Sequence, residues 1–142
     1  MKNVVIIYWS GTGNTKEMAE GIMEGALKGD TNVRLLSVGD AKVEDVINAD
    51  AVAFGCPSMG EEVLDELEME PFIESISNVV NGKNIILFGS YGWGNGEWMT
   101  DWQERMEGYG ANVIEDGLII NNAADKKGII KCKEIGELLA KA

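Results

Sequence analysis

The sequence predicts an α/β fold in which helices cover both faces of a parallel β-sheet. Five apolar runs with the length of strands alternate with segments that have the character of helices. Right-handed crossovers between successive strands then place helices on both sides of one sheet. At 142 residues, with 45% hydrophobic residues, the chain is long enough for a sizeable core, and we expect a single domain over residues 1–142.

The expected elements follow one another without a linker or an internal repeat. Strands are predicted where apolar residues run together, at residues 4–9, 32–37, 51–56, 84–91 and 112–121, the last interrupted near 115–117. Helices are predicted between them, at residues 16–28, 43–48, 71–80, 97–109 and 126–142. Pro71 falls in the first turn of its helix, where proline is tolerated, and Asn81-Gly82 ends that helix.

Loop one, residues 10–15, joins the carboxyl end of the first strand to the amino end of the first helix. Its sequence, SGTGNT, is dense in glycine and in hydroxyl and amide side chains. First-turn N–H groups of a helix lack intrahelical partners, the helix dipole adds positive potential, and glycines let the backbone fold closely around an anion. We therefore predict that loop one binds a phosphate group. The alternative is an ordinary strand-to-helix turn capped by Ser or Thr.

Two other kinds of phosphate loop do not fit this stretch. A P-loop requires Gly-Lys-Ser/Thr, and here Gly13 is followed by Asn14. A dinucleotide-binding loop requires a third glycine at the position that holds Lys16. A loop without an obligatory cation suits a terminal monophosphate better than a magnesium-bound triphosphate.

Two further loops leave the carboxyl ends of predicted strands: loop two at residues 57–62 and loop three at residues 90–96. Ligands of open α/β sheets bind at this edge. Loop three holds Trp93 between two glycines, and loop two holds Met59, whose flexible side chain packs well on a flat ring. A phosphate site beside two ring-packing side chains predicts a nucleotide-like ligand.

The other aromatic residues near these loops carry a weaker signal. Trp98 and Trp102 lie one helical turn apart and are predicted to pack in the core. Trp9 and Tyr91 stand at strand ends, where each could pack against the sheet or flank the ligand.

The acidic composition of the chain limits the kinds of partner that it can bind. Twenty-four acidic residues against twelve basic ones give a net charge of −12, which makes nucleic acid an unsuitable partner. Eleven of the acidic residues and a single lysine fall within residues 40–80, which predicts either a solvated acidic face or a docking surface for basic partners.

Without histidine there is no histidine-based acid/base catalysis or metal ligation. Two distant cysteines, no apolar run of about 18 residues and no signal peptide predict a cytoplasmic protein with free thiols.

Three motifs together resemble those of the flavodoxins, in particular the short-chain group of clostridia and related anaerobes. They are YWSGTGNT at residues 8–15, GCPSMGEE at 55–62 and FGSYGWG at 88–94, and the resemblance in order and spacing covers essentially the whole chain. It implies the sheet order 2-1-3-4-5, a non-covalently bound FMN and no metal. The implied cofactor-binding residues are Ser10, Gly11, Thr12, Gly13, Asn14, Thr15, Pro57, Ser58, Met59, Gly60, Glu61, Glu62, Ser90, Tyr91, Gly92, Trp93, Gly94 and Asn122.

The resemblance also implies a role for several of these positions. Loop one holds the FMN phosphate, and Met59 and Trp93 pack on opposite faces of the flavin ring. The Glu62 carboxylate accepts a hydrogen bond from flavin N3–H, and the Gly60–Glu61 peptide turns toward N5 on reduction. Two positions depart from the family pattern: Glu61 stands where many relatives have Asp or another small polar residue, and Ala123 stands where close relatives carry Glu.

The function that the resemblance implies is electron transfer without catalysis of its own. We expect a low-potential one-electron carrier that shuttles between the FMN semiquinone and hydroquinone, substitutes for ferredoxin and works as a monomer. Its expected partners are ferredoxin-accepting oxidoreductases with basic docking surfaces, and neither nucleic acid nor membrane. The alternative is an FMN-dependent reductase of the quinone reductase type. A signalling receiver domain would need acidic residues where this chain has Trp9-Ser10 and Cys56-Pro57, and a low-molecular-weight phosphatase would need Cys and Arg in loop one.

Overall fold

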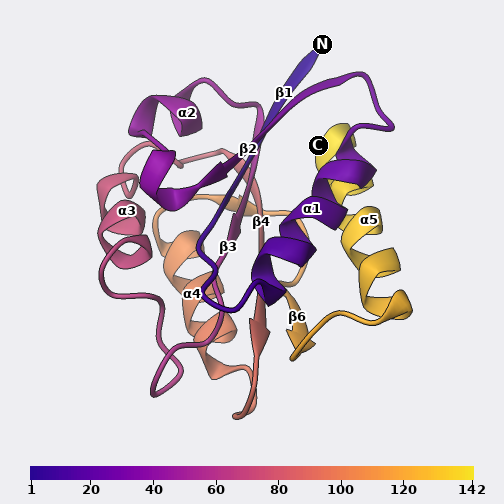
Figure 1. Cartoon of the computed structure of the whole chain (residues 1–142). Coiled ribbons are helices and arrows are strands. Elements are labelled where there is room, and N and C mark those ends of the chain that lie inside the picture. The colour runs from indigo at the N-terminus through magenta and orange to yellow at the C-terminus, as the bar shows by residue number, and fades with distance from the viewer.

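A parallel sheet lies between two layers of helices in the computed structural model, which describes residues 1–142 (Figure 1). The strands run β2-β1-β3-β4-β5, with β6 also paired to β4, and every pair is parallel. This order confirms the predicted 2-1-3-4-5 arrangement. The strands are β1 Lys2–Tyr8, β2 Thr31–Ser37, β3 Ala51–Gly55, β4 Asn84–Tyr91, β5 Asn112–Val113 and β6 Leu118–Asn121.

The predicted fifth strand is present as two short strands on the same edge of the sheet. β5 pairs with the first residues of β4, beginning at Asn84, and β6 pairs with its last residues, ending at Tyr91. Residues 115–117 bend away between them, as the sequence indicated. Gly117 closes this bend by donating its N–H to the Gln103 side chain at 3.1 Å.

Two hydrophobic clusters divide the core between the faces of the sheet, because successive strand residues point to opposite sides. On one face, Val4 and Ile6 of β1 belong to a cluster with residues of α1 and α5; on the other, Val5 and Ile7 belong to a cluster with residues of α2, α3 and α4. The helices are α1 Asn14–Ala26, α2 Val43–Ile47, α3 Met69–Ser75, α4 Glu97–Gly108 and α5 Lys126–Lys141, with a 3-10 turn η1 at Val38–Asp40.

The side chains of α4 confirm the packing predicted from their spacing. Trp98 and Trp102 are each 2% exposed, and Met106 is fully buried in the same cluster. No helix of the chain combines the length and apolar character that crossing a membrane requires.

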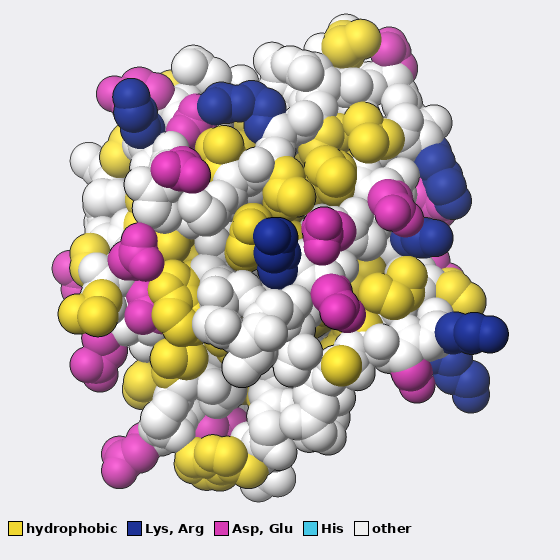
Figure 2. All heavy atoms as spheres, in the orientation of Figure 1, with side chains coloured by type: hydrophobic (Ala, Val, Ile, Leu, Met, Phe, Trp, Pro, Cys, Tyr) yellow, Lys and Arg dark blue, Asp and Glu magenta, His cyan; other side chains and the backbone are white.

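Acidic side chains gather over α3 and the segment before it. In Figure 2 this flank displays Asp and Glu, whereas most of the visible Lys and Arg lie over α1 and α5 or close to α2. Glu61, Glu66 and Glu68 are exposed there. Asp65 differs: it is only 5% exposed, and its carboxylate accepts the N–H groups of Glu68 and Met69 at 2.8 and 3.0 Å. Asp65 therefore caps the start of α3 instead of facing a partner.

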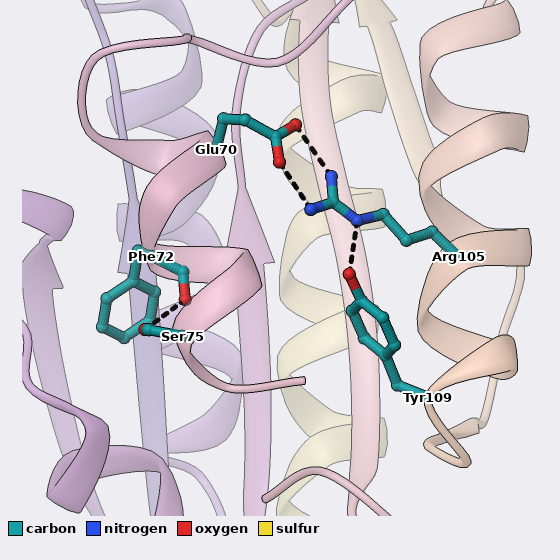
Figure 3. Close-up of polar contacts among 5 residues, drawn as sticks. All are labelled: Glu70, Phe72, Ser75, Arg105 and Tyr109. Atoms are coloured by element: carbon teal, nitrogen blue, oxygen red, sulfur yellow. Dashed lines mark hydrogen bonds and ion pairs between the residues drawn. The ribbon is translucent and has the colours of Figure 1, made fainter. Parts of the chain in front are cut away.

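The helix predicted over residues 71–80 was placed wrongly at both ends. α3 is Met69–Ser75, and residues 76–79 form turns with hydrogen bonds three residues apart. Ser75 Oγ donates to the Phe72 carbonyl at 2.6 Å, which occupies an acceptor on the last helical turn (Figure 3). Branched residues crowd the positions that follow, and they lower the helix propensity further.

Candidate cofactor site

Loops one, two and three meet beyond the carboxyl ends of β1, β3 and β4. They surround a cavity of about 270 Å³. Predicted residues of all three loops line it, and Asn122 joins them from the end of β6. The lining residues are Trp9, Gly11, Thr12, Asn14, Pro57, Ser58, Met59, Ser90, Tyr91, Gly92 and Asn122.

Loop one presents unpaired donors at the amino end of α1. The backbone N–H groups of Gly11, Thr12 and Thr15 have no acceptor within the protein. Ser10 Oγ accepts the N–H of Gly13 at 3.1 Å and of Lys16 at 3.4 Å, which closes the loop around the helix end. Free N–H groups together with the helix dipole form an anion site, so these residues fit a phosphate.

Thr15 and Ser90 lie beneath the cavity and bond to each other. Their hydroxyl oxygens are 2.9 Å apart, and the Ser90 N–H points at Thr15 Oγ1 at 3.4 Å. Both residues are nearly buried, at 1% and 4% exposure. This pair joins loop one to loop three across 75 residues of sequence and fixes the depth of the site.

Trp9 belongs to the site although the sequence left its role open. It is half-buried, lies against Gly11, and borders both the cavity between the loops and a second one of about 450 Å³. The second cavity is lined by Tyr8, Trp9, Ser10, Gly11, Thr12, Gly13, Lys16, Ser37, Val38, Gly39 and Glu68. An aromatic residue next to loop one was the available signal, but only the fold shows that Trp9 forms a wall between the two spaces.

Loop two folds into a short hairpin. Met59 and Val63 pair in antiparallel fashion through N–H···O bonds of 2.9 and 3.0 Å. The three residues between them make the turn, with positive φ angles of 49° at Gly60 and 56° at Glu62. A positive φ is strained for a residue with a side chain, so Glu62 needs support from its surroundings.

The Glu62 side chain supplies that support by reaching loop three. Its Oε1 accepts the N–H groups of Gly96 and Glu97 at 3.1 and 3.0 Å, at the amino end of α4. Its carboxyl carbon also lies only 2.7 Å from the place that a Cβ on residue 94 would occupy. The glycine at position 94, with φ of +93°, is therefore required both by the backbone and by the approach of Glu62.

Of the two predicted ring-packing residues, Met59 lines the cavity and Trp93 does not. Met59 is half-buried and lines the cavity, whereas Trp93 is 65% exposed at the tip of loop three. Tyr91 lines the cavity and also packs on Trp98, with ring centroids 5.7 Å apart, so it serves both of the purposes that the sequence left open.

Asn122 and Cys56 complete the surroundings. Asn122 has a φ of 59° and donates its N–H to the Tyr91 carbonyl at 2.8 Å, which ties the end of β6 to loop three. Cys56 is buried at the end of β3, and burial raises the pKa of its thiol to about 12. A thiol in that environment stays protonated and unreactive.

Comparisons with known proteins agree on one family. The family model described as flavodoxin matches residues 6–136. The chain is 48% identical to a flavodoxin of Clostridium beijerinckii, covering 95% of this chain and 97% of that one. It is 44% identical to a flavodoxin of Megasphaera elsdenii, covering 98% and 99%.

Solved structures give the same result. The solution structure of the two-electron reduced Megasphaera elsdenii flavodoxin superposes with a TM-score of 0.89, covering 98% of this chain and 99% of that one at 44% identity. A flavodoxin from the domain Archaea superposes with a TM-score of 0.90 at 30% identity, covering 98% and 96%. The resemblance found in the three motifs is therefore confirmed.

Proposed function

Because this chain belongs to the flavodoxin family, whose members bind FMN and carry electrons, we propose that it is a low-potential one-electron carrier that substitutes for ferredoxin. In this role it shuttles between the semiquinone and the hydroquinone of FMN. The observation that supports the proposal best is the convergence of the anion site of loop one with Met59, Tyr91 and Glu62 at one edge of the sheet. FMN supplies the one-electron chemistry, and the protein residues bind, orient and tune it.

Loop one holds the phosphate through donors that carry no charge. The free N–H groups of Gly11, Thr12 and Thr15 lie in the same region as the side chains of Thr12 and Asn14. Thr12→Ala or Asn14→Ala should therefore weaken FMN binding about tenfold or more, since a hydrogen bond to a charged group contributes roughly 1.5–3 kcal/mol.

Riboflavin, which lacks the phosphate, separates this role from general damage. Its affinity should change little in the same variants, measured by quenching of flavin fluorescence. Thr100→Ala, at an exposed position on α4, is the matched control and should bind both flavins normally. Equal losses of FMN and riboflavin affinity would refute the assignment of loop one.

Loop two governs the hydrogen bonds to the flavin ring. Gly60 carries the carbonyl that would accept a hydrogen bond from flavin N5–H, and its φ of 49° is accessible to glycine without strain. Glu62 uses Oε1 for the amino end of α4, which leaves Oε2 for flavin N3–H. Its negative charge then lies beside the ring, where it opposes further reduction.

Negative charge near the ring keeps the second reduction step at low potential. A unit charge about 10 Å away contributes roughly 0.4 kcal/mol at the dielectric constant of water and about 1.7 kcal/mol at an effective value of 20. For one electron these values correspond to about 17 and about 70 mV. Glu62→Gln should accordingly raise the potential of the second step, and Ala123→Glu should lower it. Potentiometry that gave the opposite sign for either variant would refute the electrostatic explanation.

We also propose that the exposed acidic residues around loop two form a docking face for basic redox partners. Glu66 and Glu68 flank Leu67, which is 87% exposed, and Glu61 is exposed in loop two. No Lys or Arg occurs between Lys42 and Lys83. An apolar side chain within a rim of one charge is typical of small, electrostatically steered encounters.

The docking face predicts a salt-dependent association rate. Glu61→Gln with Glu66→Gln should slow electron transfer to a ferredoxin-accepting oxidoreductase at low salt and should leave FMN affinity unchanged. The control is Glu20→Gln with Glu134→Gln, which removes the same charge from sites on α1 and α5. Equal slowing by both pairs would contradict the docking face, and rapid NAD(P)H oxidation without a partner would indicate a reductase.

A further inference from the structure

Residues 56–70, which we call the tied segment, include loop two and the start of α3. This segment carries the groups proposed to contact the flavin ring, yet most of it belongs to no strand or helix. Its beginning, middle and end are each hydrogen-bonded to α4. One helix therefore supports the whole length of the segment.

Two of the three ties lie next to the proposed flavin contacts. At the beginning of the segment, the indole Nε1–H of Trp98 donates to the Cys56 carbonyl at 3.1 Å. In the middle, the Glu62 carboxylate accepts two N–H groups from the amino end of α4. Carboxylates are stabilised at that end of a helix by the dipole as well as by the hydrogen bonds.

The third tie is an ion pair at the far end of the segment, well down α4 from the flavin loops. Figure 3 shows the Arg105 guanidinium and the Glu70 carboxylate face to face, with Arg105 Nη1 donating to Glu70 Oε1 at 2.8 Å and a second bond beside it. Arg105 Nε also donates to the Tyr109 hydroxyl at 2.7 Å, which fixes the plane of the fork. This pairing lowers the pKa of Glu70 and raises that of Arg105.

Polar ties matter here because packing between the segment and α4 is incomplete. A cavity of about 140 Å³ separates them, bordered by residues of both. Within the segment, the apolar side chains of Cys56, Leu64 and Met69 are buried, whereas Gly60 and Leu67 are exposed. None of these three apolar anchors lies within the turn at residues 60–62, which contains strained backbone at Glu62.

We propose that Glu70 and Arg105 are positioning residues for the flavin: their ion pair holds the tied segment against α4 and so presets the Gly60 peptide and the Glu62 carboxylate. The inference rests on the proposed contacts of Gly60 and Glu62 with FMN. When a loop is already held in place, the entropic cost of ordering it to form a new hydrogen bond is lower. The bond from N5–H to the Gly60 carbonyl forms only after N5 has gained a proton from solvent with the first electron, so presetting favours the first reduction step.

The shifts of the two reduction potentials in the variants distinguish this positioning role from a simple effect of charge. If only charge acted, the first step would hardly change in any variant, because the proton taken up with the electron leaves the charge of the flavin unchanged. The second step, which adds a negative charge, would rise in potential in Glu70→Gln and fall in Arg105→Gln. If the ion pair positions the loop, both single variants and the double variant lower the potential of the first step. We expect the equilibrium constant of the first step to fall about threefold, which is about 28 mV for one electron.

The experiment measures three quantities on the whole chain: the two potentials, FMN affinity, and amide hydrogen exchange of the apoprotein at residues 60–64. Exchange should accelerate severalfold in Glu70→Gln and Arg105→Gln, which reports the loosened loop without any flavin. Arg105→Lys keeps the charge and loses the two-pronged bond, so it should behave like Arg105→Gln. Glu24→Gln and Lys133→Gln break an ion pair between α1 and α5 and serve as controls that should leave all three quantities unchanged.

The outcomes separate this inference from the proposed function. An unchanged first-step potential, or opposite shifts of that potential in the two single variants, overturns the positioning role and leaves an FMN electron carrier intact. A wild-type chain that takes up no FMN would overturn the proposed function instead. Should Arg105→Gln fail to fold, Arg105→Lys and Glu70→Gln decide the question by the same signs.

Discussion

Replacing Gly94 with alanine should damage FMN binding through Glu62. The new Cβ would stand 2.7 Å from the Glu62 carboxyl carbon and 2.8 Å from its Oε1, distances that real Cβ contacts do not reach. The carboxylate must therefore move, and it loses its bonds to the N–H groups of Gly96 and Glu97. In addition, φ at this position is +93°, which disfavours any residue with a Cβ.

The expected effect of Gly94→Ala has two parts, a loss of folding stability from the backbone and a loss of FMN affinity from the site. The backbone part is about 1–2 kcal/mol of stability for a positive φ. The site part is the displaced charged hydrogen bonds, roughly 1.5–3 kcal/mol, which we expect to appear as at least a tenfold loss of FMN affinity.

Gly82→Ala is the matched control for this prediction. Gly82 has a φ of +76°, but nothing lies within 4 Å of the place that an added Cβ would occupy, and the residue precedes the amino end of β4, away from the loops of the site. Both variants should lose similar stability in urea unfolding of the apoprotein, and only Gly94→Ala should lose FMN affinity in a fluorescence titration. Wild-type affinity in Gly94→Ala, or an equal loss in Gly82→Ala, would refute the role assigned to the Glu62 contact.

Three further predictions concern stability and reactivity. The lowered pKa of Glu70 means that its pair with Arg105 contributes stability above the ordinary carboxyl pKa of 4.5, and this contribution is lost as pH falls through the folded-state value. The stability gap between wild type and Glu70→Gln should therefore close in acid, and urea midpoints that keep a constant gap from about pH 7 to about pH 3 would contradict it. Trp98→Phe should lower the free energy of unfolding by about 1–3 kcal/mol more than Trp102→Phe, because Trp98 donates to the Cys56 carbonyl whereas the buried Trp102 Nε1–H has no acceptor. Urea unfolding followed by circular dichroism measures this difference, and equal losses of stability in the two variants would disprove it. Burial raises the pKa of Cys56 to about 12, so alkylation at about pH 8 should label this thiol only after unfolding, as mass spectrometry of native and urea-treated protein would show.

Much of the fold could be predicted because the relevant signals are local. Strands buried on both faces must be continuously apolar, so β1, β3 and β4 were found within about two residues of their ends. The short β5 and β6 were found as one interrupted strand, because Glu115, Asp116 and Gly117 break the apolar run. The end of α3 was missed because the apolar spacing continues through residues 76–80 while the backbone already turns.

The site could be predicted in part for the same reason. Loop one is a continuous stretch whose glycines and donors act on the backbone next to them, so its phosphate-binding character is visible in its own six residues, 10–15. The partners of Asp65 and Trp9 were not visible. A carboxylate in an acidic stretch gives no sign that it caps a helix that begins four residues later, and an aromatic residue at a strand end gives no sign of which space it borders.

The alternation of apolar strands with helices could be predicted from the residues alone, and so could the glycine-rich donor loop after the first strand, because these features depend on residues close together in the chain. Which distant residues meet depends on how the elements pack in the folded chain. The strand order brings Thr15 to Ser90, Glu62 to the amino end of α4, and Glu70 to Arg105. These contacts join residues 75, 35 and 35 positions apart, and no local preference specifies them. Thr15 meets Ser90, and Glu62 meets α4, because the loops that follow parallel strands leave the sheet at the same edge. Glu70 meets Arg105 because α3 and α4 pack on the same face of the sheet.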